Sequence, residues 1–332
     1  MSPNWQQPNR SSLRPELSAV DVSVVICTCS SERWDDLVAA IESVQSQTLR
    51  PLEIVLVVDH DRGLAQRARE RWADLSVVEN ASDRGVSNAR NTGIEAAKGE
   101  VVAFLDDDAV AEPKWLENML LAYAEDSVIG VGGSIEPLWN GGRPAWFPDE
   151  FGWVVGCTYT GLPDRPTAVR NVIGTNMSFR RDVFGAIGGF ESRLGRVGTS
   201  PIGCDETELC VRARQRWPER SIVYDPRVRV AHRVTARRRQ WGYFVSRCYA
   251  EGRSKAVVAR LVGSRDALSS EFGYATRVLP AGVVRGVRDA LLRSDRAGWA
   301  RAGAIVVGFA ATVAGFAAAR IGGSERALSR AG

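Results

Sequence analysis

The sequence has few cysteines, and none of them are arranged in a way that predicts a disulfide framework. Its six cysteines, at positions 27, 29, 157, 204, 210 and 248, include no CxxC pair. Cys27 and Cys29 fall at the end of a predicted strand, where a disulfide framework is implausible. The cysteine pattern therefore predicts a reducing, cytosolic compartment for the main part of the chain.

The sequence also shows no strong charge imbalance, and it predicts neither a leader nor a dinucleotide-binding site. Its 43 basic and 39 acidic residues leave a net charge of +4, which is too small to predict a nucleic-acid partner. The first 17 residues are polar, with proline and glutamine, and resemble neither a signal peptide nor a helix. No GxGxxG motif follows the first predicted strand, which argues against a dinucleotide-binding oxidoreductase.

Residues 101–109 carry the clearest functional signal in the chain. An apolar run of strand length ends in three consecutive carboxylates, Asp106, Asp107 and Asp108. Ligands of open α/β sheets bind at the carboxyl ends of strands, and clustered carboxylates repel one another unless a cation neutralises them. Carboxylate oxygens suit Mg²⁺ or Mn²⁺, which often complete their shells with substrate phosphates. The run predicts a metal–diphosphate site; the alternative is a solvated acidic turn.

Strands and helices alternate along the first hundred residues. Predicted strands cover residues 21–27, 52–58, 76–78 and 101–105, and predicted helices cover 34–47, 64–72 and 86–99. This alternation predicts an α/β fold with a mostly parallel sheet flanked by helices. Further strands are predicted at 171–179, 222–224 and 228–231, with a helix at 205–217.

The last third of the chain has a different character. Residues 236–296 form a predicted basic, amphipathic helical region, which suits an anionic membrane surface. Residues 302–319 hold no charge, and as a helix they would be roughly 27 Å long, close to the hydrocarbon thickness of a bilayer. We expect a membrane-inserted helix there. A buried core helix and an in-plane hairpin are the alternatives.

Six segments, taken in order, resemble the motifs of family-2 glycosyltransferases with the GT-A fold, of a membrane-associated bacterial type. These segments are Thr28, residues 57–59, 84–91, 104–108, 174–179 and 204–210. The resemblance covers residues 21–235, which we expect to form a Rossmann-like catalytic domain. It lies between a flexible tail at residues 1–20 and the two C-terminal regions, 236–296 and 297–332, the last being the membrane helix with a short tail.

The resemblance implies an inverting transfer of a sugar from a nucleotide-diphosphate donor to a hydroxyl or phosphate acceptor. It places one group of residues at the nucleotide sugar: Thr28, Arg33, Asp59, Arg84, Arg90, Asp106 and Asp107. It places Asp106, Asp108 and His232 at a Mg²⁺ or Mn²⁺ ion. For His232 a surface position before the basic run is the alternative, and for Asp107 a turn cap.

Inversion needs a base that deprotonates the acceptor hydroxyl, and the pair Asp205 and Glu206 corresponds to the family's Glu-Asp motif. The order of the two acids is reversed here, so Glu206 falls where the family usually has its catalytic Asp. We therefore expect Glu206 to be the base, with Asp205 as the second candidate. Asn176 and Trp153 are predicted to contact the acceptor. Asn176 could instead satisfy backbone groups at a strand end, and Trp153 could pack within its own loop.

These observations predict a metal-dependent glycosyltransferase on the cytoplasmic face of the cell membrane. Its C-terminal third would attach it to the membrane, and its acceptor would be a polyprenyl-linked or other membrane-proximal glycan of cell-envelope or polysaccharide biosynthesis. One alternative is a soluble transferase that makes polysaccharide or modifies small molecules, with its last helix packed in a homo-oligomer. Another is a non-catalytic module that binds nucleotide sugars or membranes.

Overall fold

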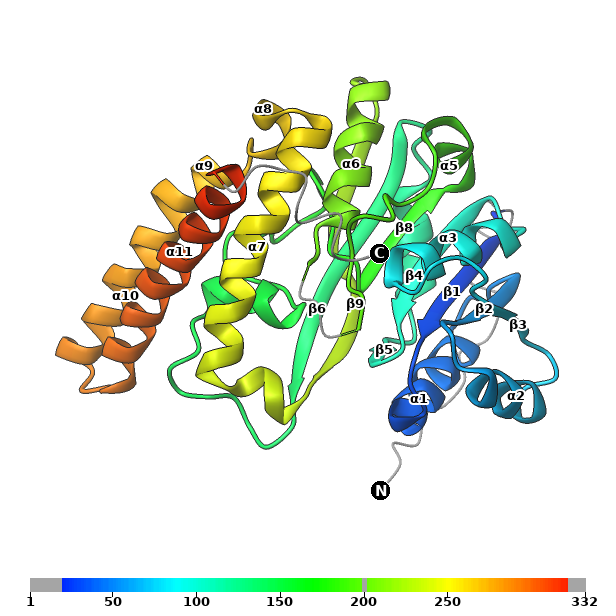
Figure 1. Ribbon diagram of the computed structural model, residues 1–332, viewed down its shortest axis with the longest axis horizontal. Helices are drawn as coiled ribbons and strands as arrows, with labels where there is room; N and C mark the ends of the chain where they lie inside the picture. The colour runs from blue at the N-terminus through cyan, green and yellow to red at the C-terminus, as the bar shows by residue number, and fades with distance from the viewer. Residues whose placement is uncertain (1–19, 199–201, 322–332) are drawn as a thin grey trace.

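A nine-stranded mixed sheet organises the chain in the computed structural model, which describes residues 20–198 and 202–321 (Figure 1). The strand order is β3-β2-β1-β4-β8-β6-β9-β5, and β7 pairs with β9 outside this path. The strands are β1 (Val22–Thr28), β2 (Glu53–Val58), β3 (Ser76–Glu79), β4 (Val101–Asp106), β5 (Ala109–Ala111), β6 (Val128–Trp139), β7 (Thr167–Val169), β8 (Asn176–Arg180) and β9 (Ser221–Val234).

Helices cover the sheet and form a separate layer at the C-terminal end of the chain. They are α1 (Trp34–Gln45), α2 (Arg62–Arg71), α3 (Val86–Ala96), α4 (Trp115–Ala122), α5 (Arg181–Ile187), α6 (Asp205–Arg216), α7 (Trp241–Val262), α8 (Ser264–Ala267), α9 (Glu271–Gly273), α10 (Leu279–Leu292) and α11 (Ala297–Ile321). Short turns of 3₁₀-helix occupy Ser31–Arg33, Asp149–Val155 and Ala236–Arg239, and Tyr274–Val278 is a π-helix. The predicted tails lie outside the described residues, apart from Val20.

The predicted α/β class with a C-terminal helical extension is confirmed. Parallel pairing joins β1, β2, β3 and β4, as the alternation of strands and helices predicted, and it also joins β6 to β9. Antiparallel pairs enter with β8, which lies between β4 and β6, and with β5 and β7 on β9. The later part of the chain therefore completes the sheet in mixed orientation.

Two predicted strand boundaries are wrong. Residues 222–224 and 228–231 belong to a single strand, β9, whose pairing with β6 shifts register between Gly133 and Ser134. The predicted strand at 171–179 begins only at Asn176, and the residues before it form a loop. This loop carries Gly174 and Thr175 to the edge of the sheet where the first strands end.

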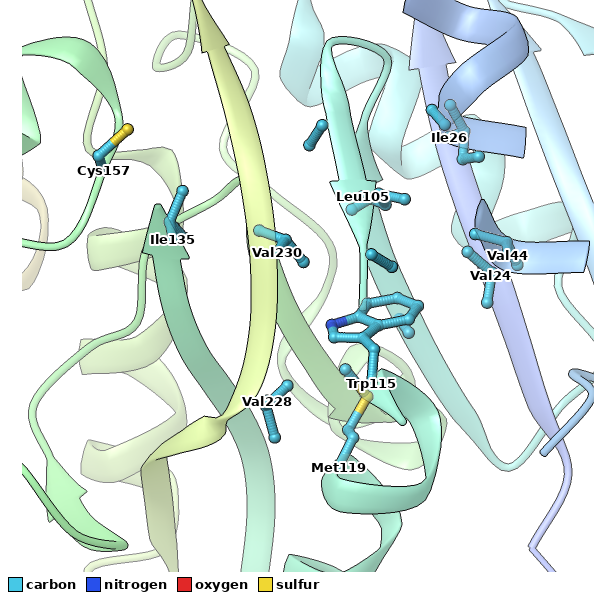
Figure 2. Packing of buried hydrophobic residues seen from close by; sticks show 14 of the residues in the cluster. Val24, Ile26, Val44, Leu105, Trp115, Met119, Ile135, Cys157, Val228 and Val230 are labelled. Atoms are coloured by element: carbon cyan, nitrogen blue, oxygen red, sulfur yellow. The ribbon is translucent and has the colours of Figure 1, made fainter. Parts of the chain in front are cut away.

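The main core lies between the sheet and its helices. Figure 2 shows the indole of Trp115, from α4, pointing into the space between Leu105 of β4 and Val230 of β9. The indole Nε1 donates to Asn176 Oδ1 at 2.8 Å, so this fully buried ring has its polar atom satisfied. Burial of these side chains fixes β4 and β9 relative to each other.

The short strand β5 directly follows β4 and pairs with β9, so it brings β9 close to the end of β4. In the antiparallel pairing of β5 and β9, Ala109 lies opposite His232, and the Arg233 amide donates to the Asp108 carbonyl at 2.9 Å. The backbone thus brings His232 beside the acidic end of β4, although more than a hundred residues separate them in sequence.

The C-terminal helices α7, α10 and α11 lie side by side at one end of the molecule, and α1 and α2 lie at the other (Figure 1). Phe244 of α7 and Ile305 of α11 belong to the same buried cluster as β1 and β4. Among the described residues, α11 is the one helix long and apolar enough to cross a membrane, with a mean hydropathy of 2.0 over an 18-residue window that is 28% buried.

Candidate active site

A cavity of about 1000 Å³ opens at the carboxyl ends of β1, β2 and β4. Twelve of the thirteen residues predicted for the site line it: Thr28, Arg33, Asp59, Arg84, Arg90, Asp106, Asp107, Asp108, Trp153, Asp205, Glu206 and His232. Asn176 does not. The side chains come from strand ends, from α3, from the first turn of α6, and from loops and 3₁₀-helices, so the fold gathers residues that are far apart in sequence into one hollow.

Three side chains in this cavity form a group that can hold a divalent cation. One ligand atom from each of Asp106, Asp108 and His232 lies within 4.8 Å of the others. His232 Nε2 lies 3.1 Å from Asp108 Oδ1, and His232 is only 2% exposed, so the alternative of a surface histidine is wrong. Two carboxylates and an imidazole are a suitable donor set for Mn²⁺ or Mg²⁺ with open positions for other ligands.

The charge of Asp108 is stabilised by its neighbours. Burial raises the pKa of Asp108, but His232, Arg238 and Arg33 outweigh this effect and hold the pKa well below its usual range. Arg238 Nη2 lies 3.7 Å from Asp108 Oδ2. Asp108 is therefore ionised at neutral pH, as a metal ligand must be.

Asp107 links the ends of β1 and β4. Its carboxylate accepts hydrogen bonds from Thr28 Oγ1 at 2.8 Å and from Arg33 Nη1 at 2.6 Å. Burial raises the pKa of Asp107 to about 6 in spite of the Arg33 charge. Asp107 follows β4, whereas Thr28 ends β1 and Arg33 lies just after it. These contacts therefore hold the ends of the two strands together at the wall of the cavity.

Asp59, at the end of β2, is held in a fixed orientation. It accepts hydrogen bonds from Asn80 Nδ2 at 2.7 Å and from the Gly85 amide at 3.0 Å, and His60 Nδ1 lies 2.9 Å away. Gly85 has φ of +146°, a conformation that side chains disfavour. The sequence interpretation missed Asn80, although a polar residue directly after a short strand, at the same sheet edge, is a usable signal.

Arg90 joins three parts of the site. Its guanidinium donates to Asp205 Oδ2 at 2.6 Å, to Asp106 Oδ1 at 3.3 Å and to the Gly174 carbonyl at 3.2 Å. Burial lowers the pKa of Arg90, but Asp205 and Asp106 more than offset this and raise it overall. The buried ion pair engages the carboxylate of Asp205. Because Arg90 also contacts Asp106, it fixes the start of α6 against the end of β4.

Glu206 differs from Asp205, its neighbour in the first turn of α6. Within the described part of the chain it forms no ion pair, and it lines the cavity. Burial, reinforced by the charge of Asp205, raises the pKa of Glu206 to about 8. Cys204, which caps the helix, has φ of +68°, an uncommon conformation for a residue with a side chain. Glu206 thus lies at the cavity without an ion-pair partner among the described residues, and it holds its proton more strongly than an ordinary glutamate.

The two residues predicted to contact an acceptor differ in their surroundings. Asn176 is fully buried, accepts from Trp115 Nε1, and donates to the carbonyls of Ser134 and Val228 at 3.1 and 2.8 Å. These contacts are those of the alternative, in which Asn176 satisfies backbone groups at a strand end, and they do not support the predicted contact with the acceptor. Trp153 lines the cavity and donates through Nε1 to Tyr274 Oη at 3.2 Å.

Several basic residues in the cavity were not predicted individually. Arg238, in the basic region that begins at residue 236, lines the cavity. Arg196 enters from a glycine-containing loop, and Arg247 from α7. Arg247, Glu251 and Lys255 are spaced by four residues, which predicts one helix face but not what that face packs against.

The model of the family described as "Glycosyl transferase family 2" matches residues 23–188. The chain is 38% identical over 241 residues to "Glucosyl-dolichyl phosphate glucuronosyltransferase" of Haloferax volcanii, and the matched region covers 71% of this chain and 77% of that protein. It is 30% identical over 182 residues to "Glycosyltransferase AglE" of the same organism, covering 52% of this chain and 57% of that one.

Two solved structures share the fold. The "Mannosyltransferase PcManGT from Pyrobaculum calidifontis in complex with GDP-Man and Mn2+" has a TM-score of 0.54 at 18% identity and covers 89% of both chains. The "Crystal structure of GalNAc-T7 with UDP, GalNAc and Mn2+" has a TM-score of 0.51 at 21% identity, and the match covers 70% of this chain and 47% of that one. Both likenesses agree with the predicted GT-A fold.

Proposed function

The chain belongs to glycosyl transferase family 2, and from this premise we propose that it transfers a sugar, with inversion, from a nucleotide-diphosphate donor to a lipid-linked acceptor at a membrane surface. The observation that carries the proposal is the convergence of Asp59, Asp106, Asp108 and Glu206 on one cavity. The glucuronosyltransferase relative, whose name includes a dolichyl phosphate, supports the lipid-linked acceptor.

The donor would occupy the part of the cavity at the ends of β1, β2 and β4. Asp59 is fixed by Asn80 and Gly85 with its carboxylate at the cavity wall, where it can accept hydrogen bonds from the base or ribose. Thr28, Arg33 and Arg84 line the same region, and the arginines suit the phosphates. The nucleotide ligands named with the two solved structures, UDP and GDP-Man, are consistent with this class of ligand.

Asp106, Asp108 and His232 would hold Mg²⁺ or Mn²⁺. A divalent ion there offsets the negative charge that develops on the departing diphosphate. Thr175 Oγ1 donates to Asp106 Oδ2 at 2.8 Å, and Arg90 donates to Asp106 Oδ1. These hydrogen bonds orient the carboxylate that faces the ion.

Glu206 would act as the base. The acceptor oxygen forms a bond to the anomeric carbon, the bond from that carbon to the diphosphate oxygen breaks on the opposite face, and the hydroxyl proton passes to the Glu206 carboxylate. Asp205, paired with Arg90 at 2.6 Å, keeps the helix end in place. Trp153 lines the cavity and remains a proposed acceptor contact.

The substitution Glu206→Gln tests this proposal with Glu95→Gln, an exposed position on α3, as the control. Each variant is screened against nucleotide sugars with and without Mn²⁺. We expect Glu206→Gln to bind the donor with unchanged affinity and to lose transfer by roughly a hundredfold or more, the size of a general-base contribution. Unchanged turnover would remove Glu206 as the base.

The membrane contact would be an in-plane one. α11 packs along α7 through Gly308 and Gly315, whose missing side chains let Phe244 and Tyr249 approach closely. A helix that crosses a bilayer would have to leave this packing. The exposed side chains of α10 and α11 include Val284, Leu291, Leu292, Trp299, Val306, Val307, Phe309 and Val313. This set, which we call the apolar helical face, suits a bilayer surface on the cytoplasmic side.

A further inference from the structure

The cavity of the candidate site continues beyond the carboxylates to a wall made of apolar side chains. Phe309, Val313 and Phe316 of α11 and Leu279 of α10 line this end. Phe309 and Val313 are 43% and 50% exposed, so the wall reaches the surface of the molecule at the apolar helical face. One hollow therefore extends from a charged end at the sheet to an apolar end at the surface that we propose for the membrane.

Basic side chains line the cavity as well. On α7, Arg247 lies 2.9 Å from Glu251, and Lys255 lies 3.3 Å from Glu251 and also pairs with Glu271. Arg170 Nη2 donates to Glu271 at 3.0 Å. Three basic side chains and two carboxylates leave this network with one positive charge.

Arg247 is a member of this network that has an unsatisfied hydrogen-bond donor. It is only 8% exposed, and its Nε has no hydrogen-bond acceptor among the described residues. A buried donor of this kind is costly unless a ligand or water satisfies it. Since Arg247 lines the cavity, an anion bound there would satisfy the donor.

Arg196 and Arg238 face the same space. Arg196 forms no ion pair within the described part of the chain. Burial lowers the pKa of the Arg196 guanidinium, and the nearby charges of Arg238 and Arg247 lower it further. All three arginines line the same cavity, and guanidinium groups are well suited to bind a phosphate group.

We infer that Arg196 and Arg247, assisted by Arg238, bind the phosphate group that joins the hydrocarbon chain of a lipid-linked acceptor to its sugar, and that the hydrocarbon chain leaves the cavity along Phe309 and Val313. The inference deepens the proposed function, on which it rests, by naming the acceptor's recognition groups. A planar guanidinium matches phosphate oxygens with paired donors, and the apolar wall matches a hydrocarbon chain. A small water-soluble acceptor would use the first feature but not the second.

The test measures binding to the full-length protein in detergent by isothermal titration calorimetry. The probes are farnesyl phosphate, farnesol and inorganic phosphate, which separate the contribution of the charge from that of the chain. We expect farnesyl phosphate to bind at least tenfold more tightly than either of the others. Arg247→Gln and Arg196→Gln should each weaken farnesyl phosphate binding by about tenfold to a hundredfold, the range for a charge-assisted hydrogen bond, and Arg247→Lys should recover part of it.

The matched control is Arg253→Gln, which removes the same charge from an exposed position of the same helix and should leave the affinity unchanged. Equal affinity for farnesol and farnesyl phosphate would overturn the phosphate site. Equal affinity for inorganic phosphate would overturn the role of the apolar wall. Because Arg196 lies on a loop, its variant remains informative if Arg247→Gln does not fold.

Binding of UDP and GDP in the presence of Mn²⁺, measured on the same samples, separates this inference from the proposed function. If Arg247→Gln weakens nucleotide binding and leaves farnesyl phosphate binding intact, the arginines belong to the donor and the inference is overturned. If the wild-type protein binds no nucleotide, the proposed donor chemistry fails, while the lipid titrations still decide the phosphate site.

Discussion

Two adjacent carboxylates, Asp205 and Glu206, have different environments although both lie in the first turn of α6. Asp205 is paired with buried Arg90, whereas the pKa of Glu206 is raised to about 8 by burial and by the charge of Asp205. Different environments give neighbouring carboxylates different roles in many active sites. The order of the two acids in the sequence suggested Glu206, and the Arg90 contact supplies a physical reason that the sequence did not contain.

The raised pKa of Glu206 predicts a pH dependence of transfer. A base must be ionised to accept a proton, so the active fraction should increase as the pH rises through about 8 and fall about tenfold for each unit below it. The measurement is kcat/KM between pH 6 and 9.5. Donor affinity, titrated over the same range, is the control. A rate already constant above pH 6 would contradict the assignment.

Asp108→Asn should weaken binding of Mn²⁺ by at least tenfold. The substitution removes one carboxylate ligand and also the contact with His232, which lies 3.1 Å away. Electron paramagnetic resonance of free Mn²⁺ measures the affinity directly. The exposed Asp126, which lies after α4, provides the control Asp126→Asn. Equal affinity in the two variants would mean that the three-residue group does not hold the ion.

At the residue scale, the sequence predicted the site residues that directly follow strands. It missed the site residues whose position in the cavity depends on how a helix packs. Asp59 and Asp106 directly follow apolar runs, so their meeting at one sheet edge follows from the topology. Arg247 lies in the middle of a helix, and its place in the cavity depends on how α7 packs against the sheet and α11. Asn176 was predicted to contact the acceptor, because the sequence does not show the long-range contacts with Trp115 and Val228 that bury it.

At the scale of elements, glycines set how closely α11 approaches α7. A Cβ on Gly315 would lie 2.0 Å from the Tyr249 carbonyl oxygen, and a Cβ on Gly252 would lie 1.9 Å from the Thr312 carbonyl oxygen. The two backbones are therefore in direct contact. The uncharged run at 302–319 predicted a helix, and the structure shows that α7 is the element against which one face of this helix packs.

Gly315→Ala should destabilise the protein by about 1–3 kcal/mol, the cost of inserting an atom into a close-packed contact. Gly303→Ala is the control on the same helix, because a Cβ there has nothing within 4 Å. The control should be neutral or stabilising, by up to about 1 kcal/mol, since alanine is the better helix former. Denaturant unfolding of both variants measures the difference. Equal stabilities would contradict the close contact.

The elements themselves were predictable to different degrees. The alternation from β1 to β4 followed from continuous apolar runs, which are typical of parallel strands buried on both faces. The pairing of β8, β6 and β9 could not be predicted in the same way, because long connections separate these strands and they pair in both parallel and antiparallel orientation. Residues 225–227, which include Pro226, looked like the end of a strand, but β9 continues through them while Arg227 and Asp225 form an ion pair at 2.7 Å.

For the molecule as a whole, the apolar helical face predicts reversible membrane binding. Replacing Leu292 and Val306, which are 76% and 57% exposed, with glutamine should weaken binding to anionic vesicles by roughly tenfold or more, since each buried aliphatic side chain contributes about 1.5–3 kcal/mol. Leu52→Gln, at a 50% exposed position before β2, is the control. Co-sedimentation measures the effect. If all variants bind equally, this face does not contact the bilayer.

Because α11 supplies both a wall of the cavity and the face proposed to meet lipid, adsorption and turnover share one structural element. An enzyme built in this way should respond to the mole fraction of acceptor within the membrane surface, with its bulk concentration having little influence once the protein is adsorbed. Diluting the acceptor with inert phospholipid at constant total acceptor would then slow the reaction. α11 would thus determine whether the reaction rate follows the surface concentration or the bulk concentration of the acceptor.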